Sequence, residues 1–377
     1  MSRKIAVMGG FGGDNLGDEL IGLAEAGFLR ENGLEPLLYS FSPSVSQGVQ
    51  PEVSWLDYRE FPDYFQRLRN LVRRYSTGER QLLPDAVIIG AGGLLYDTPL
   101  THLIGWHSRT LFLRKRHIPY ALFANSLRRP KSALARYLLR EVLKHAVSVS
   151  LRDRLSLDIA RELYPRDDYR LGRDPVLSLG TLLRSAPARP AAKGRIAVVP
   201  RPWAASGKDG GLSFWQELLE GLVQQGLEPV LVAFDSRMDI EFCERLRSSL
   251  ALGVVRSRDS AGHGLADAGV LFDDCEMIFG MRFHALILAL LLEKPMLAFS
   301  YDEKVTGLMA DLGMSSLCYE LDGDAPAALA FVEQGVQYLR SKESEVSAAM
   351  REYVEQAREL TVRDFFATIE VHPQSEK

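Results

Sequence analysis

The sequence predicts an α/β protein with two domains, each built around a parallel β-sheet. Short apolar segments alternate with amphipathic ones, and glycine-rich or polar turns stand between them. Near the middle, the Pro/Ala-rich segment Ser185–Gly194 lacks apolar periodicity, and the alternating pattern restarts after it. The chain length of 377 residues fits two domains, and an apolar content of 46% is typical of soluble proteins.

In the first half, apolar runs bounded by glycine, proline or polar residues are the expected strands. Amphipathic spacing and flanking turn residues predict the helices between them. We expect strands at Lys4–Met8, Pro36–Ser40, Ala86–Ile89, Pro119–Ala124 and Ala146–Leu151, and helices at Asp18–Glu31 and Lys131–His145.

The second half repeats this alternation and ends in a polar helical segment from Ala328 to about Ile369. We expect strands at Arg195–Val199, Glu228–Phe234, Met277–Phe279 and Met296–Phe299, and helices at Leu212–Gln225, Asp239–Leu250 and Arg282–Leu292. The expected domains are therefore residues 1–184 and 195–340, with a linker at 185–194 and a C-terminal helical segment at 341–377.

In open α/β sheets, ligands bind beyond the carboxyl ends of the strands. Two such Rossmann-like domains are expected to face a cleft that holds the binding site. This two-domain plan resembles the architecture of GT-B glycosyltransferases.

Composition narrows the class of protein and its location. Cys243, Cys275 and Cys318 are widely spaced and form no C-x-x-C pair, which argues against disulfides and a cysteine-based zinc site. No apolar run is long enough to span a bilayer, and the N-terminus enters a strand pattern at once. We therefore expect a cytoplasmic protein.

Charge is distributed unevenly along the chain. Residues 1–180 hold 25 Lys+Arg and 20 Asp+Glu, which gives +5, whereas the remainder holds 20 and 29, which gives −9. Arg136, Arg140 and Lys144 form a basic stripe on one expected helix. This half could contact an anionic partner or the inner membrane surface. Its charges could equally be solvated helix faces.

Two glycine-rich turns follow expected strands. The first runs from Gly9 to Glu19 and includes Asn15, Gly17 and Asp18; the second holds Gly92, Gly93 and Asp97. Glycines let a backbone approach a ligand closely. Neither turn is a Walker A loop, and the first lacks the third glycine of a dinucleotide-binding fingerprint. Asp18 could instead cap the following helix.

Cationic residues end several expected strands. Arg152 follows one of them and could clamp a carboxylate or phosphate. It could instead form a surface ion pair, or Asp153 could be the N-cap of a helix. In Pro200-Arg201-Pro202-Trp203, the arginine could reach a ligand, and the tryptophan could stack on a sugar or pack internally. Gly280-Met281-Arg282-Phe283-His284 enters a helix, and Lys304 follows the next strand. His284 could transfer a proton near neutral pH, or be structural.

The ordered set of these stretches resembles the polysaccharide pyruvyl transferase family, in particular its CsaB-type branch. The matching features are Gly12-x-x-Asn15-x-Gly17-Asp18-Glu19, Gly92-Gly93 with Asp97, Arg152-Asp153 with Ser156, Asp174-Pro175, Arg201-Pro202-Trp203, Gly280-Met281-Arg282-x-His284-Ala285 and Ser300-Tyr301-Asp302-x-Lys304.

The resemblance implies a GT-B-like fold and transfer of the pyruvyl group of phosphoenolpyruvate onto two hydroxyls of a saccharide, forming a cyclic ketal. It also implies that Arg152, His284 and Lys304 act on phosphoenolpyruvate. Independently of the resemblance, a donor with a carboxylate and a phosphate needs cations, which Arg152, Lys304 and Arg282 could supply. His284 is the expected general acid and Asp18 the expected base. No metal or organic cofactor is required.

The chain departs from the family pattern at Ala124–Pro130, where two arginines replace glycines. This leaves the acceptor open between a lipid-linked and a nucleotide-linked saccharide. Two alternatives remain: a GT-B glycosyltransferase that uses a nucleotide sugar, and a non-catalytic relative that binds glycans. Nucleic-acid binding is not expected, because no such module is present.

Overall fold

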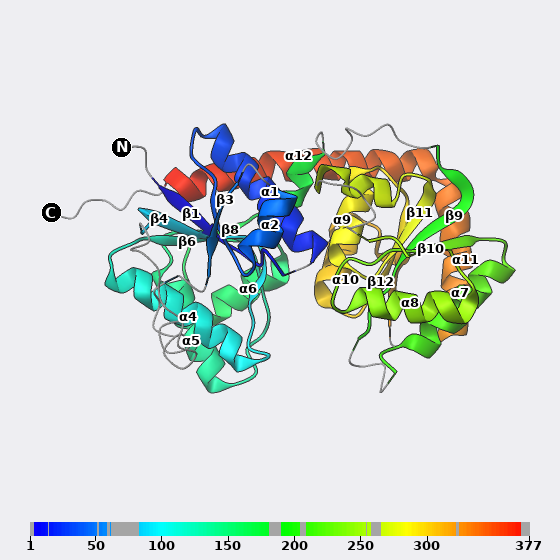
Figure 1. Cartoon of the computed structure of the whole chain (residues 1–377), viewed down its shortest axis with the longest axis horizontal. Coiled ribbons are helices and arrows are strands. Elements are labelled where there is room, and N and C mark those ends of the chain that lie inside the picture. Colours follow the sequence, from blue (N-terminus) through cyan, green and yellow to red (C-terminus); the bar gives the residue numbers. More distant parts are fainter. Residues whose placement is uncertain are drawn as a thin grey trace. The chain divides into compact units, whose positions relative to one another are not determined.

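This computed structural model describes residues 4–13, 15–50, 53–58, 61, 83–180, 190–203, 209–253, 255–257, 265–321 and 324–370. The chain forms two compact units. Unit 1 holds Met1–Gly13, Asp18–Ser178 and Ala357–Lys377, and unit 2 holds Asp14–Gly17 and Leu179–Gln356. Half of the expected linker, residues 185–189, lies outside the described residues. Figure 1 shows helices on both sides of the sheet in each unit.

Unit 1 contains an eight-stranded sheet in the described residues, with all of its paired strands parallel. Its order is β3-β2-β1-β4-β6-β7-β8, and β5 pairs with β6. The strands are β1 (Ile5–Met8), β2 (Leu37–Ser40), β3 (Ser54–Asp57), β4 (Ala86–Ile89), β5 (Gly92–Leu95), β6 (Tyr120–Leu127), β7 (Val149–Leu151) and β8 (Tyr169–Leu171).

Apolar side chains on both faces of this sheet bury its central strands. On one face, Phe28 and Phe123 pack against Phe365, with ring centroids 4.9 and 5.0 Å from that of Phe365. On the other, Met8 and Trp106 belong to one buried apolar cluster. The helices of this unit are α1 (Leu16–Glu31), α2 (Pro43–Val49), α4 (Leu100–Lys115), α5 (Ala133–His145), α6 (Arg154–Leu163) and the final part of α12 (Glu343–Glu370).

Unit 2 contains a five-stranded parallel sheet in the described residues, in the order β10-β9-β11-β12-β13. Its strands are β9 (Ala192–Val199), β10 (Glu228–Leu231), β11 (Cys275–Gly280), β12 (Met296–Ser300) and β13 (Cys318–Glu320). Its helices are α7 (Leu212–Gln224), α8 (Asp239–Leu250), α9 (Phe283–Leu291), α10 (Glu303–Asp311), α11 (Ala325–Ser341) and the first part of α12. Short 3-10 turns η1 (Pro175–Leu179), η4 (Leu265–Leu271) and η5 (Ser315–Leu317) complete the described elements.

The predicted parallel α/β class is confirmed, since all strand pairs in both sheets are parallel. One local prediction was wrong. Gly92 and Gly93 were expected in a turn, but they begin strand β5, whose Gly92 aligns with Asn125 of β6. The turn itself is shorter because the chain re-enters the sheet two residues after Gly90, with Gly92 at a φ of +109° that favours glycine.

Each sheet reverses its direction of winding at one point. In unit 1 the chain runs outward from β1 to β3 and then returns to place β4 on the other side of β1. In unit 2, β10 and β11 likewise lie on opposite sides of β9. Loops that follow the two strands at such a point separate and leave room for a ligand at the carboxyl edge.

The last turns of α12 are tied to unit 1 by a buried carboxylate. Ser150 donates to Asp364, and so does the Nε group of Arg170. Arg170 Nη2 also donates to Ser148 and Thr368 hydroxyls, each at 2.8 Å. The C-terminal helix therefore completes the sheet surface around β7 and β8. In the described residues, no helix is both long enough and apolar enough to cross a bilayer.

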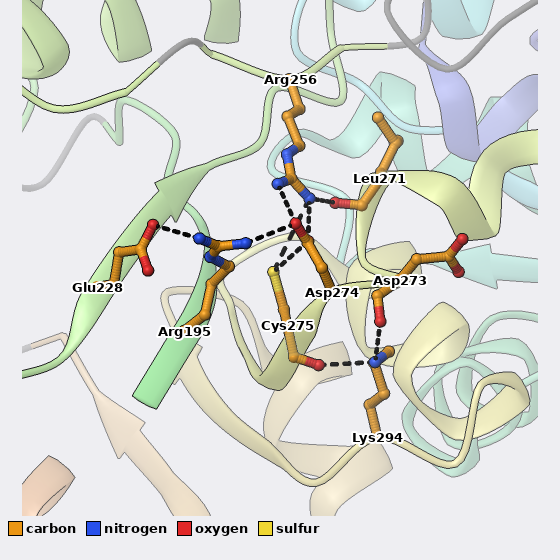
Figure 2. Close-up of polar contacts among 8 residues, drawn as sticks. All are labelled: Arg195, Glu228, Arg256, Leu271, Asp273, Asp274, Cys275 and Lys294. Atoms are coloured by element: carbon orange, nitrogen blue, oxygen red, sulfur yellow. Dashed lines mark hydrogen bonds and ion pairs between the residues drawn. The ribbon is translucent and has the colours of Figure 1, made fainter. Parts of the chain in front are cut away.

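A second charge network closes the amino edge of the sheet in unit 2. Figure 2 shows Asp274 between two guanidinium groups. Arg195 Nη1 lies 2.8 Å from this carboxylate, and Arg256 donates to both of its oxygens at 2.7 and 3.0 Å. Lys294 donates to the Asp273 and Cys275 carbonyls at 3.1 and 2.6 Å. Burial raises the pKa of Cys275 to about 11, so this thiol stays protonated near neutral pH.

We expect Asp274→Asn to destabilise unit 2 in a pH-dependent way. Hydrogen bonds from Arg256 lower the pKa of Asp274 far below its unfolded value of about 3.9. The ionised carboxylate therefore contributes full stability above about pH 5, and this contribution is lost as the pH falls below about 4 toward the folded pKa. Urea unfolding should show a loss of about 2 kcal/mol at pH 7.

The difference in unfolding free energy between wild type and Asp274→Asn should stay constant from about pH 5 to 8 and shrink by about pH 3. Glu320→Gln is the matched control, since this exposed carboxylate lies at the carboxyl end of β13. A difference that grew on acidification would contradict the assignment of stability to the ionised Asp274.

Candidate functional site

The expected cations of unit 2 gather along one edge of its sheet. Arg201 follows β9, Arg282 and His284 follow β11, and Lys304 follows β12. Tyr301, a neutral residue, lies just after the end of β12 beside them. Because β11 lies between β9 and β12, and parallel strands end at the same edge, these loops are neighbours.

Arg282 is held by a buried carboxylate that the sequence analysis did not single out. Its Nε donates to Asp239 Oδ2 at 2.9 Å, and its Nη2 donates to Oδ1. The side chain of Asp239 is 0% exposed and also accepts the backbone N–H groups of Phe234 and Asp235, at 3.2 and 3.1 Å. This carboxylate therefore joins the loop after β10, the start of α8 and the loop after β11.

Arg201 lies close enough to Arg282 for the two charges to interact. Burial and then this like charge lower the pKa of Arg201. Its Nη1 donates to the Tyr301 hydroxyl, its Nε lies 3.3 Å from the Pro202 carbonyl, and its guanidinium lies 4.7 Å from the Tyr301 ring centroid.

Trp203 is 9% exposed and contacts Phe214 edge-to-face at 5.6 Å, so its ring packs internally.

His284 occupies the first turn of α9, for which Arg282 is the N-cap residue. Gly17, which belongs to unit 2, leaves the space that the imidazole fills: a Cβ added there would lie 2.1 Å from His284 Nδ1. The Leu16 N–H donates to the Phe234 carbonyl at 2.9 Å, and Asn15 accepts from the Gly17 N–H at 2.9 Å. The start of α1, with Asn15 before it, thus sets the position of the histidine.

Lys304 lies in the first turn of α10. Asp302 caps this helix by accepting the Lys304 N–H at 3.2 Å, and the Lys304 ammonium lies 3.8 Å from the same carboxylate. The contact is loose, and both side chains are partly exposed.

In unit 1, the two glycine turns follow β1 and β4, the strands at its reversal point. Asp18 lies beside both turns, since a Cβ on Gly10 would be 3.1 Å from its carboxyl and one on Gly92 would be 4.0 Å away. Asp18 is in the first turn of α1 and is not its N-cap residue, because the helix begins at Leu16. Gly93 is exposed, and Asp97 accepts the Lys131 N–H at 2.7 Å.

A buried glutamate lies beneath the second of these turns. Glu25 accepts the Ala91 N–H at 2.7 Å, and its carboxyl fills the space beside Gly90 that a Cβ would need. Burial raises the pKa of Glu25 to about 8, so it is mostly protonated at neutral pH. The Asn125 side chain donates to the Gly90 carbonyl. Glu25 and Asn125 therefore hold the backbone of this turn, and Asp18 lies near its Gly92.

Arg152 is also paired inside its own unit. It donates to Asp174 through Nη1 and to the Ser126 hydroxyl through Nε at 2.6 Å. The Arg152 and Asp174 side chains are only 4% and 2% exposed. Asp153 is the N-cap residue of α6, and its carboxylate accepts the Ser156 N–H at 2.8 Å.

Sequence reasoning missed the residues that hold the expected ones in place. Asp239 stood at the start of an expected helix, and Glu25 stood inside an apolar helix face, which is an unusual place for an acid. Tyr301 was quoted beside Lys304 without a role. No group of described residues has the composition and spacing of a metal site.

We expect Gly17→Ala to move the His284 ring, because the added methyl group would overlap Nδ1. In nuclear magnetic resonance spectra, the chemical shift of the His284 Hε1 signal should change. Gly27→Ala is the matched control in the same helix, where an added Cβ meets nothing within 4 Å. The control should leave the histidine signal unchanged and stabilise the helix by about 1 kcal/mol. An unmoved signal in Gly17→Ala would contradict this positioning role.

Comparison with solved structures shows that the fold is GT-B-like. A glycosyltransferase from Rickettsia africae matches with a TM-score of 0.63 and 12% identity, covering 100% of both chains. A trehalose-6-phosphate structure from E. coli bound with UDP-2-fluoro glucose matches at 0.59 and 13%, covering 99% of this chain and 100% of that one. S. aureus MnaA with UDP matches at 0.57 and 10%, covering 93% and 91%. At these identities the likeness concerns the fold alone.

Sequence comparison assigns the family. A search of curated proteins finds no match. The profile of the polysaccharide pyruvyl transferase family matches residues 15–303, which is more than half of the chain and includes Arg152, Arg201 and His284. The chain is a member of the polysaccharide pyruvyl transferase family.

Proposed function

We propose that this protein transfers the pyruvyl group of phosphoenolpyruvate to two hydroxyls of a saccharide, as a member of the CsaB-type branch. The observation that carries the proposal is the family match over residues 15–303 together with the cationic edge of unit 2. There, Arg201, His284 and Lys304 follow three adjacent parallel strands. A dianionic or trianionic donor is the kind of substrate that such an edge attracts.

The proposed reaction begins with proton transfer to the donor. His284, as imidazolium, protonates the methylene carbon of phosphoenolpyruvate, and the neighbouring carbon becomes oxocarbenium-like. One saccharide hydroxyl attacks this carbon, the carbon–oxygen bond to phosphate breaks, and inorganic phosphate leaves. The second hydroxyl then attacks the same carbon and closes the cyclic ketal. One of the two hydroxyl protons leaves with the phosphate, and the other replaces the proton that the histidine gave up. A phosphate nearby favours the charged form of the imidazole, against the opposing effect of the α9 N-terminus.

The remaining expected residues have proposed roles within their own units. Lys304 would neutralise donor charge, because its side chain is partly exposed at this edge of the sheet. Arg282 would act indirectly, since Asp239 already occupies its guanidinium. Arg152 stays a proposed donor residue by its match to the family. Asp18, beside Gly10 and Gly92, is the proposed base for an acceptor hydroxyl.

The first experiment follows the donor carbon. The protein is incubated with phosphoenolpyruvate and a panel of lipid-linked and nucleotide-linked saccharides, and phosphate release and the mass gain of the acceptor are measured. In D2O, one deuterium should enter the ketal methyl group. A parallel incubation uses a nucleotide sugar as the donor. Release of nucleoside diphosphate there, with no consumption of phosphoenolpyruvate in the first incubation, would replace this proposal with glycosyl transfer.

We expect His284→Asn to lower kcat about 10²- to 10⁴-fold, the range for loss of a general acid, while phosphoenolpyruvate binding changes much less. Asparagine keeps a polar side chain at the site, so the fold should be preserved. Steady-state phosphate release gives kcat, and calorimetry gives the donor affinity. Control variant His107→Asn removes an imidazole from α4 in unit 1. Equal activity in wild type and His284→Asn would rule out the general-acid role.

A lipid-linked acceptor would be reached from the membrane surface, and α5 is the proposed contact. Its outer face carries Arg136, Arg140 and Lys144 together with Leu134 and Tyr137, which are 51% and 57% exposed. Basic side chains near an anionic membrane gain about 1 kcal/mol each, and exposed apolar groups insert between head groups.

We expect the wild type to sediment with vesicles of phosphatidylglycerol and phosphatidylcholine, and much less with phosphatidylcholine alone. Arg136→Glu/Arg140→Glu should reduce sedimentation more than about tenfold, because two attractions become repulsions. Arg358→Glu, on the exposed side of α12, is the control. If the double variant sedimented with the vesicles as much as the wild type does, α5 would not be the membrane contact.

A further inference from the structure

Arg201 differs from the other buried or partly buried arginines described above. Arg282 is paired with Asp239, Arg152 with Asp174, and Arg195 and Arg256 with Asp274. Arg201 has no carboxylate within ion-pair distance in the described part of the chain. A guanidinium taken partly out of water needs an anion to offset the cost of its desolvation.

We propose that Arg201 and the Tyr301 hydroxyl together bind one oxyanion group of the donor, either its phosphate or its carboxylate. This inference rests on the proposed function, because it names the donor as the anion. It assigns to Arg201 the charge-binding role expected of Arg282, whose guanidinium is already occupied.

The hydrogen bonds of Arg201 leave donors available. A guanidinium has five N–H groups. Among the described residues, Tyr301 accepts one of them from Nη1, and the Pro202 carbonyl accepts a long one from Nε. The other N–H groups, including both on Nη2, have no acceptor there, and the side chain is partly exposed. Two adjacent N–H groups of this kind match the two oxygens of a carboxylate or phosphate.

Tyr301 adds a third donor. Its oxygen accepts from Arg201, so its own O–H hydrogen points elsewhere and can donate to an anion. Its ring also lies against the guanidinium, 4.7 Å from centroid to carbon, which orients the planar group. The phenol therefore fixes the arginine and extends its donor set.

Nearby carboxylates are already used by other groups. Asp239 is occupied by Arg282 and two backbone N–H groups. Asp235 accepts the N–H groups of Arg237 and Met238, and its other oxygen is 3.9 Å from Arg282. Residues 204–208, which follow Trp203, contain no aspartate or glutamate.

The position of Arg201 suits a substrate contact. It follows β9, and Tyr301 follows β12, on either side of the strand that leads to His284. Pro200, Pro202 and the packed ring of Trp203 restrict the loop that carries it. A rigid cation at a sheet reversal point can hold one end of the donor while the histidine acts on the other.

The test measures binding to full-length protein by calorimetry, with phosphoenolpyruvate, inorganic phosphate and pyruvate as separate ligands. Arg201→Gln should weaken phosphoenolpyruvate binding about 10- to 100-fold, the range for a charged hydrogen bond. Tyr301→Phe should weaken it about fivefold, the effect of one neutral hydrogen bond. If phosphate is the bound group, inorganic phosphate binding falls in parallel; if the carboxylate is, pyruvate binding does.

Two matched variants act as controls. Arg340→Gln removes a guanidinium that pairs with Glu276 on the strand that precedes His284, and Tyr319→Phe removes a hydroxyl from the neighbouring strand β13. Both should bind phosphoenolpyruvate like the wild type. Thermal unfolding of Arg201→Gln checks its fold. Removing this unmatched, partly buried charge should leave the stability equal to or above that of the wild type, whereas loss of a purely structural arginine should lower it.

The outcomes separate this inference from the proposed function. Wild-type binding of phosphoenolpyruvate that survives both Arg201→Gln and Tyr301→Phe overturns the oxyanion site and leaves pyruvyl transfer standing. If the wild type binds a nucleoside diphosphate and not phosphoenolpyruvate, and Arg201→Gln abolishes that binding, the proposed function fails while the oxyanion site is supported. Loss of stability in Arg201→Gln without any change in binding identifies a structural residue and overturns the inference.

Discussion

The geometry of unit 2 depends on one buried carboxylate. Asp239 stands at the first position of α8, accepts two backbone N–H groups from the loop before it, and accepts two hydrogen bonds from the Nε and Nη2 edge of the Arg282 guanidinium. A buried charge is tolerated when its hydrogen bonds are complete, and here they come from two different loops. The Asp239–Arg282 ion pair therefore fixes the backbone at the start of α9, the helix that carries His284. The His284 ring fits there because Gly17 has no side chain.

The two edges of this sheet use charge in opposite ways. At the amino edge, Asp274 neutralises two guanidinium groups, and Lys294 is satisfied by carbonyls, so the network is complete within the protein. At the carboxyl edge, Arg201 keeps donors without acceptors among the described residues. Complete networks stabilise a fold, whereas an incomplete one predicts a ligand that completes it.

Unit 1 shows how glycine turns are supported by acids. Glu19 accepts the Gly12 N–H at 2.6 Å, and Glu25 accepts the Ala91 N–H. Both glutamates are 0% exposed and come from the same helix, α1. This one helix thus holds both turns at the reversal point, and Asp18, in its first turn, lies beside Gly10 and Gly92.

The sequence by itself determined the parallel α/β class, most central strands, and which cations end which strands. These follow from local rules: apolar runs bounded by turns form buried strands, and polar residues after them reach the carboxyl edge. It also identified the family, because the family's motifs occur in the same order along this chain. It did not reveal β3, β8 and β13, which are short strands toward the sheet margins and lack a long apolar run.

Only the tertiary structure decided which of the cations are already paired. Arg282 lies 43 positions from Asp239, and Arg152 lies 22 from Asp174, so no local pattern could identify these partners. The same holds for Gly17 beside His284, and for the last turns of α12, which belong to unit 1. Ion pairing and close packing are set by distance in space, and parallel sheets with long crossover connections bring together residues that are far apart in the chain.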